Sequence, residues 1–583
     1  MNKNIFYFKS LLITFLLPSV ALLAQNKKDS LTTKVIDVVK SYTPTIADAY
    51  KKREDANIKK DSLSLDKKQI SYSIYSVPVA STFVPEKGKA TAVKKTIKRE
   101  NYNDSYVGGA FGNLNTLYGD ASITLPVNDE SNVGFLFNHL SSNGEVKDII
   151  LDNNYAKTTA EVRYDYLDRD FNWGISADLG RRLYNWYGVK TGIYTEEQLK
   201  QIASPKQVYF DYGVGGYLKL TDSYFEGLNL SLRGLSDKFN SSEINFKLAP
   251  SFQIPISKDE QKIRLNLLFD YYSGSFARGY LTSNSVDNKW LLFGVNPSYH
   301  FSVDNLDLKL GATLAYAGGN PTQESNFKAF PDIEVSYQFP STNTILHGAV
   351  RGMFQQNTFE KLTKINPYLA PIQTINPTNV NIDAFLALKG EVGKGLYYRL
   401  QGGYKQYENL PLFTTNSDVT ATSPLVYQNY NSFYLEYDKV NEFGLTAELG
   451  GNLEDIFFFN LEGKVTGYST KNQEEAWNLP RTRLSLFTDV KILEGLFVGI
   501  DLFYVGSRYE RDYVISLTNP AKLSLSGYFD LNLHADYTIN KKWMIFAKAN
   551  NLTSGNYERW AYYPVHGFQM FAGVKYLFSL GKR

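Results

Sequence analysis

The chain has 583 residues, a net charge of +3, no cysteine, 21% charged residues and 15% aromatic residues. The lack of cysteine excludes disulfide scaffolds, cysteine-ligated metal centres and cysteine nucleophiles. The near-neutral charge lacks the basic character of a nucleic-acid-binding protein, and after residue 24 no apolar run approaches the ~18 residues of a membrane helix.

Residues 1–24 have the pattern of a signal peptide. Lys3 and Lys9 supply positive charge, and residues 11–23 form an apolar stretch that is too short to span a bilayer. Ala24 supplies a small residue at the expected cleavage point. The alternative, a retained anchor helix, would need a longer apolar run. We therefore expect an exported protein, and the strand pattern described below predicts the Gram-negative cell outer membrane as its location.

Residues 25–104 form a basic segment that differs from the rest of the chain. Between residues 26 and 104 there are 17 Lys or Arg and 10 Asp or Glu, a net charge of +7, whereas residues 105–583 carry a net charge of −6. The segment is mostly polar and is expected to be largely irregular.

One short stretch of this segment is apolar and β-branched: Val35, Ile36, Asp37, Val38 and Val39. Such a stretch has the character of a strand that pairs with the exposed sheet edge of a partner. Docking of the same stretch on this protein itself is an equal alternative.

From residue 105 onward the dominant pattern is strict alternation of apolar and polar side chains. The last run places one set on an apolar face: Phe568, Met570, Ala572, Val574, Tyr576 and Phe578. The opposite face carries Gln569, Gly573 and Lys575. The runs last about 10–15 residues, which matches the ~9–11 residues of a tilted strand that crosses a membrane.

Twenty-two such runs are predicted, near 105–114, 117–126, 131–142, 153–166, 171–184, 206–220, 227–237, 242–256, 262–274, 288–302, 306–316, 326–339, 344–357, 381–390, 396–407, 437–451, 456–470, 478–490, 496–508, 522–537, 542–552 and 564–578. Short polar turns alternate with long connections, as in an outer-membrane barrel. The predicted fold is all-β: a transmembrane antiparallel β-barrel of about 22 strands over residues 105–578, preceded by a short periplasmic or lumenal segment and followed by an extension, 579–583. In the region 408–436 the pattern allows one hairpin more or one fewer.

The C-terminal run resembles that of TonB-dependent outer-membrane receptors. The resemblance rests on residues 549–553, Tyr557-Glu558, Pro564, Gly567 and the terminal run 573–578. Within that run, Gly573, Tyr576 and Phe578 are similar to the β-signal that the barrel-assembly machinery binds. Residues 38–49 and the region from Gly112 to Ser142 are similar to receptor-like barrels of Bacteroidota. Phe571 departs from the family pattern, which prefers a polar residue there.

The resemblance implies a plug domain before the barrel, and the 79 residues from 26 to 104 are too few and too polar to form one. Three interpretations follow. The segment folds into the lumen as a minimal stopper, it binds a partner in the periplasm, or another chain supplies the plug. Residues 35–39 could also serve as a remnant TonB-binding segment, with TonB as the partner.

The sequence contains no nucleophile elbow, no P-loop and no zinc-protease motif, so we expect no enzymatic activity, cofactor or metal. Charged and polar residues on the non-lipid faces of the strands are expected to line the lumen: Arg481, Arg483, Asp530, Asn532, His534 and Asp536. Arg481 and Arg483 could contact an anionic solute or pair with lumenal carboxylates.

Two functions remain. The first is a plugless receptor-like barrel that acts as a scaffold or accessory subunit of an outer-membrane complex for protein assembly, secretion or transport. The alternative is a TonB-dependent-type transporter or channel for a solute. The missing plug favours the first, and the resemblance favours the second. The expected partners are membrane lipid, the barrel-assembly machinery and other outer-membrane or periplasmic proteins, with no nucleic acid.

Overall fold

A computed structural model describes residues 105–190, 192–202, 204–256, 262–319, 325–393, 395–416, 425–514 and 520–581. The signal peptide, the basic segment with residues 35–39, and the question of a plug all fall outside these residues. Within them, 22 antiparallel strands form one closed sheet. The predicted fold class and strand number are therefore confirmed.

The barrel strands are β1 (Ser105–Gly112), β2 (Thr116–Pro126), β3 (Ser131–Ser142), β4 (Tyr155–Leu167), β5 (Phe171–Asn185), β6 (Lys206–Leu220), β7 (Phe225–Asp237), β8 (Ser242–Pro255), β9 (Lys262–Phe276), β10 (Val286–Val303), β11 (Leu306–Gly318), β12 (Asn326–Gln338), β13 (Thr344–Gln355), β14 (Thr378–Val392), β15 (Leu396–Thr415), β16 (Phe433–Leu453), β17 (Phe457–Thr470), β18 (Thr482–Leu493), β19 (Leu496–Val505), β22 (Tyr528–Asn540), β23 (Trp543–Asn550) and β26 (Gln569–Phe578). Two small hairpins lie in connections: β20 (Arg508–Asp512) with β21 (Ala521–Leu525), and β24 (Glu558–Trp560) with β25 (Tyr563–Pro564). Within the described residues the helices are α3 (Glu196–Gln201) and α4 (Phe359–Ile365).

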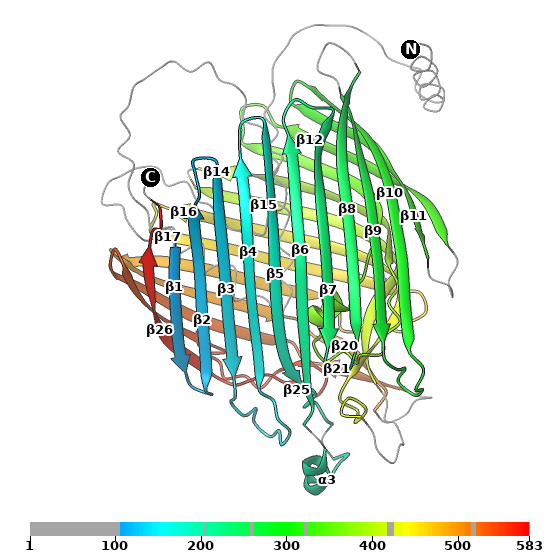
Figure 1. Ribbon diagram of the computed structural model, residues 1–583, viewed down its shortest axis with the longest axis vertical. Helices are drawn as coiled ribbons and strands as arrows, with labels where there is room; N and C mark the ends of the chain where they lie inside the picture. Colours follow the sequence, from blue (N-terminus) through cyan, green and yellow to red (C-terminus); the bar gives the residue numbers. More distant parts are fainter. Residues whose placement is uncertain are drawn as a thin grey trace. The chain divides into compact units, whose positions relative to one another are not determined.

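The barrel closes where its first and last strands meet. Strand β1 pairs with β26 in a continuous antiparallel register from Ser105 opposite Phe578 to Gly112 opposite Phe571. Figure 1 shows this seam as blue β1 beside red β26. Closure leaves the sheet without a free edge, as a membrane-spanning sheet requires.

Three parts of the predicted strand map are wrong in detail. Residues 522–525 alternate as expected but belong to the hairpin β20–β21, and β22 begins only at Tyr528, after Ser526-Gly527 interrupts the pattern. The last strand begins at Gln569, because 563–564 pair within β24–β25. No hairpin was gained or lost at 408–436; instead β15 and β16 are longer than expected, at 20 and 21 residues.

The two faces of each strand differ in the way the alternation predicts. On β16, Leu445 is 69% exposed and pairs with Val465, which is 57% exposed. The adjacent Thr446 pairs with Lys464 on the opposite face, where Lys464 forms an ion pair with Glu442 at 2.9 Å. The exposed apolar face is therefore the lipid face, and the charged face lines the lumen.

A charge on the lipid face of β16 is expected to destabilise the barrel. Leu445→Arg should cost ~2–4 kcal/mol because Leu445 lies near the middle of its strand, where arginine meets hydrocarbon. Thr446→Arg, one residue further on, places the same group in the polar lumen and should cost far less. Unfolding in denaturant of the purified variants in lipid vesicles measures both. Equal losses would mean that the two faces are assigned wrongly.

All the long connections of the described chain lie at one end of the barrel. At one end the turns are short, and aspartates at positive φ, such as Asp222 (φ 53°) and Asp304 (φ 51°), close them. At the other end lie the long connections, with α3, β20, β21 and β25 (Figure 1, lower end). By the usual orientation of such barrels, the long-loop end is extracellular. Neither helix of the described chain has the length and apolar character to span a membrane.

Candidate functional site

The extracellular mouth of the barrel contains a folded structure that we call the lumenal cap. It consists of the connection 356–377 between β13 and β14, which includes α4, together with residues of three other connections: 186–190, 425–432 and 558–564. The cap packs on the inner faces of β5–β10. The residues it contacts alternate with exposed, lipid-facing residues such as Phe210 (48%) and Ile244 (48%), which places the cap inside the wall.

Helix α4 begins at a carboxylate supplied by the barrel wall. Glu243, at the start of β8, accepts hydrogen bonds from the backbone N–H groups of Phe359 and Glu360, each at 2.7 Å, and from the hydroxyl of Tyr272 at 2.9 Å. The side chain of Thr358 caps the same end by accepting from the N–H of Lys361. A buried carboxylate thus satisfies N–H groups that a short helix leaves without partners.

Arg233 of β7 joins the same helix to the wall by ion pairs. Its guanidinium contacts Glu360 at 2.8 Å and Asp178 of β5 at 3.0 Å. Burial of Glu360 alone would raise the pKa of its carboxyl, but the hydrogen bonds from Arg233 and the charge of Lys364, 2.6 Å away, lower the pKa to about 2. Glu360 is therefore ionised, and its pairing with Arg233 persists, across the physiological pH range.

A third polar contact comes from Arg182 of β5, which is 2% exposed. It forms a bidentate ion pair with Asp211 of β6, at 2.7 and 2.8 Å, and also donates to the Thr363 hydroxyl at 3.1 Å. Bidentate pairs of this kind fix geometry as well as charge. Three wall residues, Arg182, Arg233 and Glu243, therefore hold α4 in one orientation.

An apolar core surrounds these polar contacts. Phe359 is 1% exposed and lies edge-on to Phe276 at 5.0 Å and to Tyr209 at 6.0 Å. The segment after the helix continues the core with Leu369 and Ile375, both fully buried. Burial of this depth is characteristic of a domain interior rather than of a solvated loop.

Backbone groups of the cap bond to side chains of the wall. Trp290 donates to the carbonyl oxygen of Ile375 at 2.9 Å. Asn288 donates to the carbonyl oxygen of Gln373 and accepts from the N–H of Ile375, at 3.0 and 2.9 Å. The non-helical chain is thereby satisfied inside the lumen without secondary structure of its own.

Aromatic rings from a separate connection complete the cap. Tyr563 of β25 stacks on Tyr368 with ring centroids 3.6 Å apart, and Trp560 of β24 packs against Phe413 and Phe433 at 5.2 and 5.4 Å. The cap therefore joins connections that are almost 200 residues apart in the sequence.

A buried carboxyl, Glu510 of β20, lies beside the cap. It accepts from the N–H of Thr415 at 3.1 Å and from the side-chain amide of Asn478. Burial raises the pKa of this carboxyl well above its usual range, and the hydrogen bond from Asn478 opposes the rise only in part. The neutral acid is the form that this site favours.

The β20–β21 hairpin is expected to lose stability as the pH rises. Folding raises the pKa of Glu510. Below the ordinary pKa of a glutamate the carboxyl is neutral in both the folded and the unfolded chain, so the raised pKa costs no stability. Above that pKa the unfolded chain is stabilised by ionisation while the folded chain stays neutral, so the free energy of unfolding falls as the pH rises. Glu510→Gln should therefore reduce the loss of loop protease resistance between pH 5 and pH 8. Glu454→Gln, in an exposed turn at the other end, is the control and should leave the profile unchanged. An unaltered profile in Glu510→Gln would contradict this assignment.

The structure places the predicted lumenal residues as follows. His534 on β22 contacts Asp489 at 2.8 Å, and Asp530, Asn532 and Asp536 share its inner face. Asn532 accepts from the N–H of Asn551 at 3.0 Å, and Asp530 accepts from Tyr557 at 2.9 Å.

The two predicted arginines are separated. Arg483 lies on β18 opposite Lys464, whereas Arg481 precedes that strand and pairs with Glu475 in the 471–481 connection at 3.2 Å. Neither belongs to the lumenal cap. In the described ranges, no three histidine, aspartate or glutamate side chains are grouped as ligands of a metal ion.

The alternation pattern did not predict the cap, and residues 358–380 were expected to form a long loop. A signal was present: from residue 365 to 377 the connection has no charged residue and carries Ile365, Leu369, Ile372 and Ile375. An extracellular connection of that composition is unlike a solvated loop. The wall residues that hold it gave no comparable signal, since charged lumenal positions recur on many strands.

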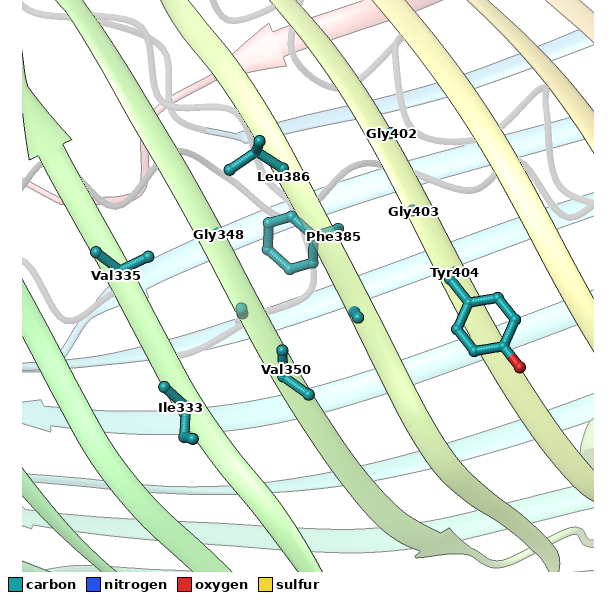
Figure 2. Close-up of a pocket in the computed structure, with 11 residues that line it drawn as sticks. Ile333, Val335, Gly348, Val350, Phe385, Leu386, Gly402, Gly403 and Tyr404 are labelled. Carbon is teal, nitrogen blue, oxygen red and sulfur yellow. The ribbon is translucent and has the colours of Figure 1, made fainter.

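A shallow hollow on the outer wall is no candidate for a solute site. It lies over β12–β15, where Gly348 and Gly402 leave space between larger side chains (Figure 2). Its neighbours Ile333 and Leu386 are 42% and 55% exposed on the lipid face. The hollow therefore faces acyl chains.

No protein-family model matches the sequence, and no curated protein matches it. Solved structures do match. The pyoverdine outer-membrane receptor FpvA from Pseudomonas aeruginosa aligns with a TM-score of 0.59 at 14% identity, over 81% of this chain and 78% of that one. The FrpB iron transporter from Neisseria meningitidis aligns with a TM-score of 0.60 at 8% identity, over 81% of each chain.

The ferric-catecholate import receptor Fiu from E. coli K12 also aligns, with a TM-score of 0.57 at 10% identity over 82% of each chain. The fold is that of outer-membrane receptors. At these identities the likeness concerns the fold and not the solute. The description of the lumenal cap rests on the contacts given above and not on these structures.

Proposed function

We propose that this protein is a receptor-type outer-membrane transporter for a solute too large for a porin, with the lumenal cap as its extracellular gate. The observation that carries the proposal is how the cap is held. Arg182, Arg233 and Glu243 bind α4 through ion pairs and hydrogen bonds, which a polar solute can replace with contacts of its own. In a wide barrel whose mouth is closed by such polar contacts, a solute that replaces the contacts would release the cap and open the lumen.

The structural neighbours support this proposal over the scaffold that the sequence favoured. FpvA is named as a pyoverdine receptor, FrpB as an iron transporter and Fiu as a ferric-catecholate import receptor. Ferric chelates are accordingly the first solutes to test. TonB would supply energy in such a mechanism, and residues 35–39 remain the candidate segment for it.

The test is uptake in a strain that lacks the gene. Growth on a panel of ferric chelates, each as the sole iron source, should fail for at least one chelate and recover when the gene is restored. The matched control restores the gene with Phe359→Asp, which should disrupt the cap while keeping the barrel.

The scaffold remains a second candidate because the cap interior excludes solvent as a folded domain does: Leu369, Ala370 and Ile375 are fully buried. A permanently closed barrel would suit a subunit that binds other proteins. Affinity purification from membranes separates the two functions. A stoichiometric partner together with unchanged growth on every chelate would favour the scaffold and reject the transporter.

A further inference from the structure

The lipid face of β3, β4 and β5 carries a polar row near its extracellular end, which we call the outer row. Its members are His139, Thr158 and Arg181, which lie directly opposite one another in the unbroken register of the three strands. On the same faces, Leu179 of β5 is 67% exposed and Val162 of β4 is 49% exposed. The alternation therefore directs the outer row away from the lumen and toward the membrane.

The outer row lies in a part of the lipid face that has no acidic residue. The structure describes strands β3–β6 in full, and none of their lipid-facing positions is Asp or Glu. The same positions include Arg181, Lys206 and His139. Any charge on this part of the lipid face is therefore positive.

Arg181 has no acidic partner. Its side chain is exposed, and within the described residues it takes part in no ion pair and no side-chain hydrogen bond. The residue opposite it on β6 is Phe210, which offers no acceptor. The next residue, Arg182, points inward and pairs with Asp211 at 2.7 Å. A guanidinium presents five N–H donors, so those of Arg181 need acceptors from the surroundings of the barrel.

The other two members of the row present a hydroxyl beside Arg181. Nδ1 of His139 lies 2.8 Å from Oγ1 of Thr158, and its Nε2 lies 3.1 Å from Oγ of Ser141. With the ring proton on Nδ1, His139 donates to Thr158 and accepts from Ser141. The O–H of Thr158 is then available as a donor next to the guanidinium.

Arg181 lies at the depth of the outer-leaflet headgroups. At the periplasmic end, Trp173 of β5 packs on Tyr164 and Tyr166 of β4, with ring centroids 5.1 and 6.4 Å apart, as in an interfacial aromatic girdle. Arg181 is eight residues further along β5, which is ~27 Å along the strand and ~21 Å along the membrane normal at the usual tilt. The apolar band of such barrels is ~25 Å tall, so Arg181 lies close to its extracellular boundary.

A phosphate group on a lipid fits these features together. A guanidinium binds phosphate through two parallel hydrogen bonds, and a hydroxyl can donate to a further oxygen. The exposed side chains of Leu179 and Phe210 adjoin the row and offer apolar contact to an acyl chain. A soluble phosphate would gain nothing from that contact, whereas phosphorylated glycolipids of the outer leaflet carry both groups at this depth. The surroundings therefore favour a lipid over a free anion.

We propose that the outer row binds one phosphorylated lipid of the outer leaflet, with its phosphate on Arg181 and Thr158 and an acyl chain along Leu179. The site is on the outside of the wall and does not depend on the solute or on the gate. Its position nevertheless relates the two, because Arg182, the next residue of β5, donates to Thr363 of α4 on the inside. Strand β5 then holds a lipid on one face and the lumenal cap on the other.

Lipid retention by the purified protein tests the proposal. Delipidated protein in detergent is mixed with bisphosphorylated lipid A or with its dephosphorylated form, and native mass spectrometry counts the lipids that remain bound to each barrel. Arg181→Gln removes the guanidinium. Lys289→Gln is the matched control, because Lys289 is an exposed cation near the extracellular end of β10, on the same face as the 43% exposed Phe293, and has the acidic Asp287 beside it.

We expect the parent to retain the phosphorylated lipid several-fold more than Arg181→Gln, and Lys289→Gln to match the parent. Arg181→Lys keeps the charge without the two parallel donors and should fall between them. Heat-modifiability of each variant verifies that the barrel has folded. In folded protein, equal retention by the parent and Arg181→Gln, equal retention of the dephosphorylated lipid, or displacement of the lipid by inorganic phosphate would each overturn the proposal.

Discussion

Gly573→Ala is expected to prevent normal closure of the barrel. A Cβ at this position would lie 2.1 Å from the carbonyl oxygen of Gly109 and 2.5 Å from the Cβ of Ala110. Both atoms belong to β1, whose backbone cannot retreat without losing its pairing with β26. The cost should reach the upper end of the ~1–3 kcal/mol typical of overpacking, and it falls on the pairing that closes the sheet.

The fraction of heat-modifiable, protease-resistant protein in the outer membrane measures this effect. Gly467→Ala on β17 is the matched control, because a Cβ there meets nothing within 4 Å. Similar folded fractions for the two variants would show that the seam tolerates the methyl group. Glycine at 573 is thus explained by close approach of two strands, independently of any β-signal.

The β-signal assignment is tested separately by truncation after Lys575. The truncation removes Tyr576, which packs on Trp543 with ring centroids 4.9 Å apart, and the register pairs that Leu577 and Phe578 make with β1. We expect no folded barrel to reach the membrane. Recovery of a protease-resistant barrel from the truncated chain would reject the assignment.

Phe359→Asp is expected to release the lumenal cap while leaving the barrel intact. Truncating a buried phenylalanine typically costs ~3–5 kcal/mol, and an unpaired carboxylate in the same pocket adds a desolvation penalty. The loss is confined to contacts between α4 and the inner wall, since no barrel strand depends on Phe359 for pairing.

Labelling from outside the cell measures the release. Leu369→Cys places a thiol at a fully buried position of the cap in a chain without other cysteines. A membrane-impermeant maleimide should label it slowly in the parent and many-fold faster with Phe359→Asp. Ile365→Asp, on the same helix but 43% exposed, is the control and should change labelling little. Equal labelling in all three would mean that the cap does not depend on the α4 core.

The barrel was predictable because each strand's alternation of lipid-facing and lumen-facing side chains can be recognised in a short stretch of sequence. Alternation along 568–578 correctly separated Met570 and Val574, each 50% exposed, from Lys575, which is 1% exposed. The same pattern identifies a strand but not its partner, so Leu523 and Leu525 were assigned to the barrel although they pair within a loop hairpin.

The cap was not predictable in the same way because its contacts are remote in sequence. Phe359 meets Glu243 across 116 residues, and Arg182 meets Thr363 across 181. Nothing near Glu243 distinguishes it from the lumenal charges of other strands. Sequence could indicate that 365–377 is too apolar for a solvated loop, but not which wall residues receive it.

The position of α4 also bears on the cross-section of the barrel. The chain connects the helix to β13 and β14, whereas its ion pairs and hydrogen bonds are to β5, β7 and β8. The connection therefore forms a strut between two wall segments, and β7 and β13 lie six strands apart in the sheet. A wide ring of hydrogen-bonded strands resists stretching along its circumference far better than it resists flattening. A strut fixed at both ends sets the separation of the two wall segments, so displacement of the helix by a ligand would be transmitted to the outline of the whole ring, including its periplasmic opening.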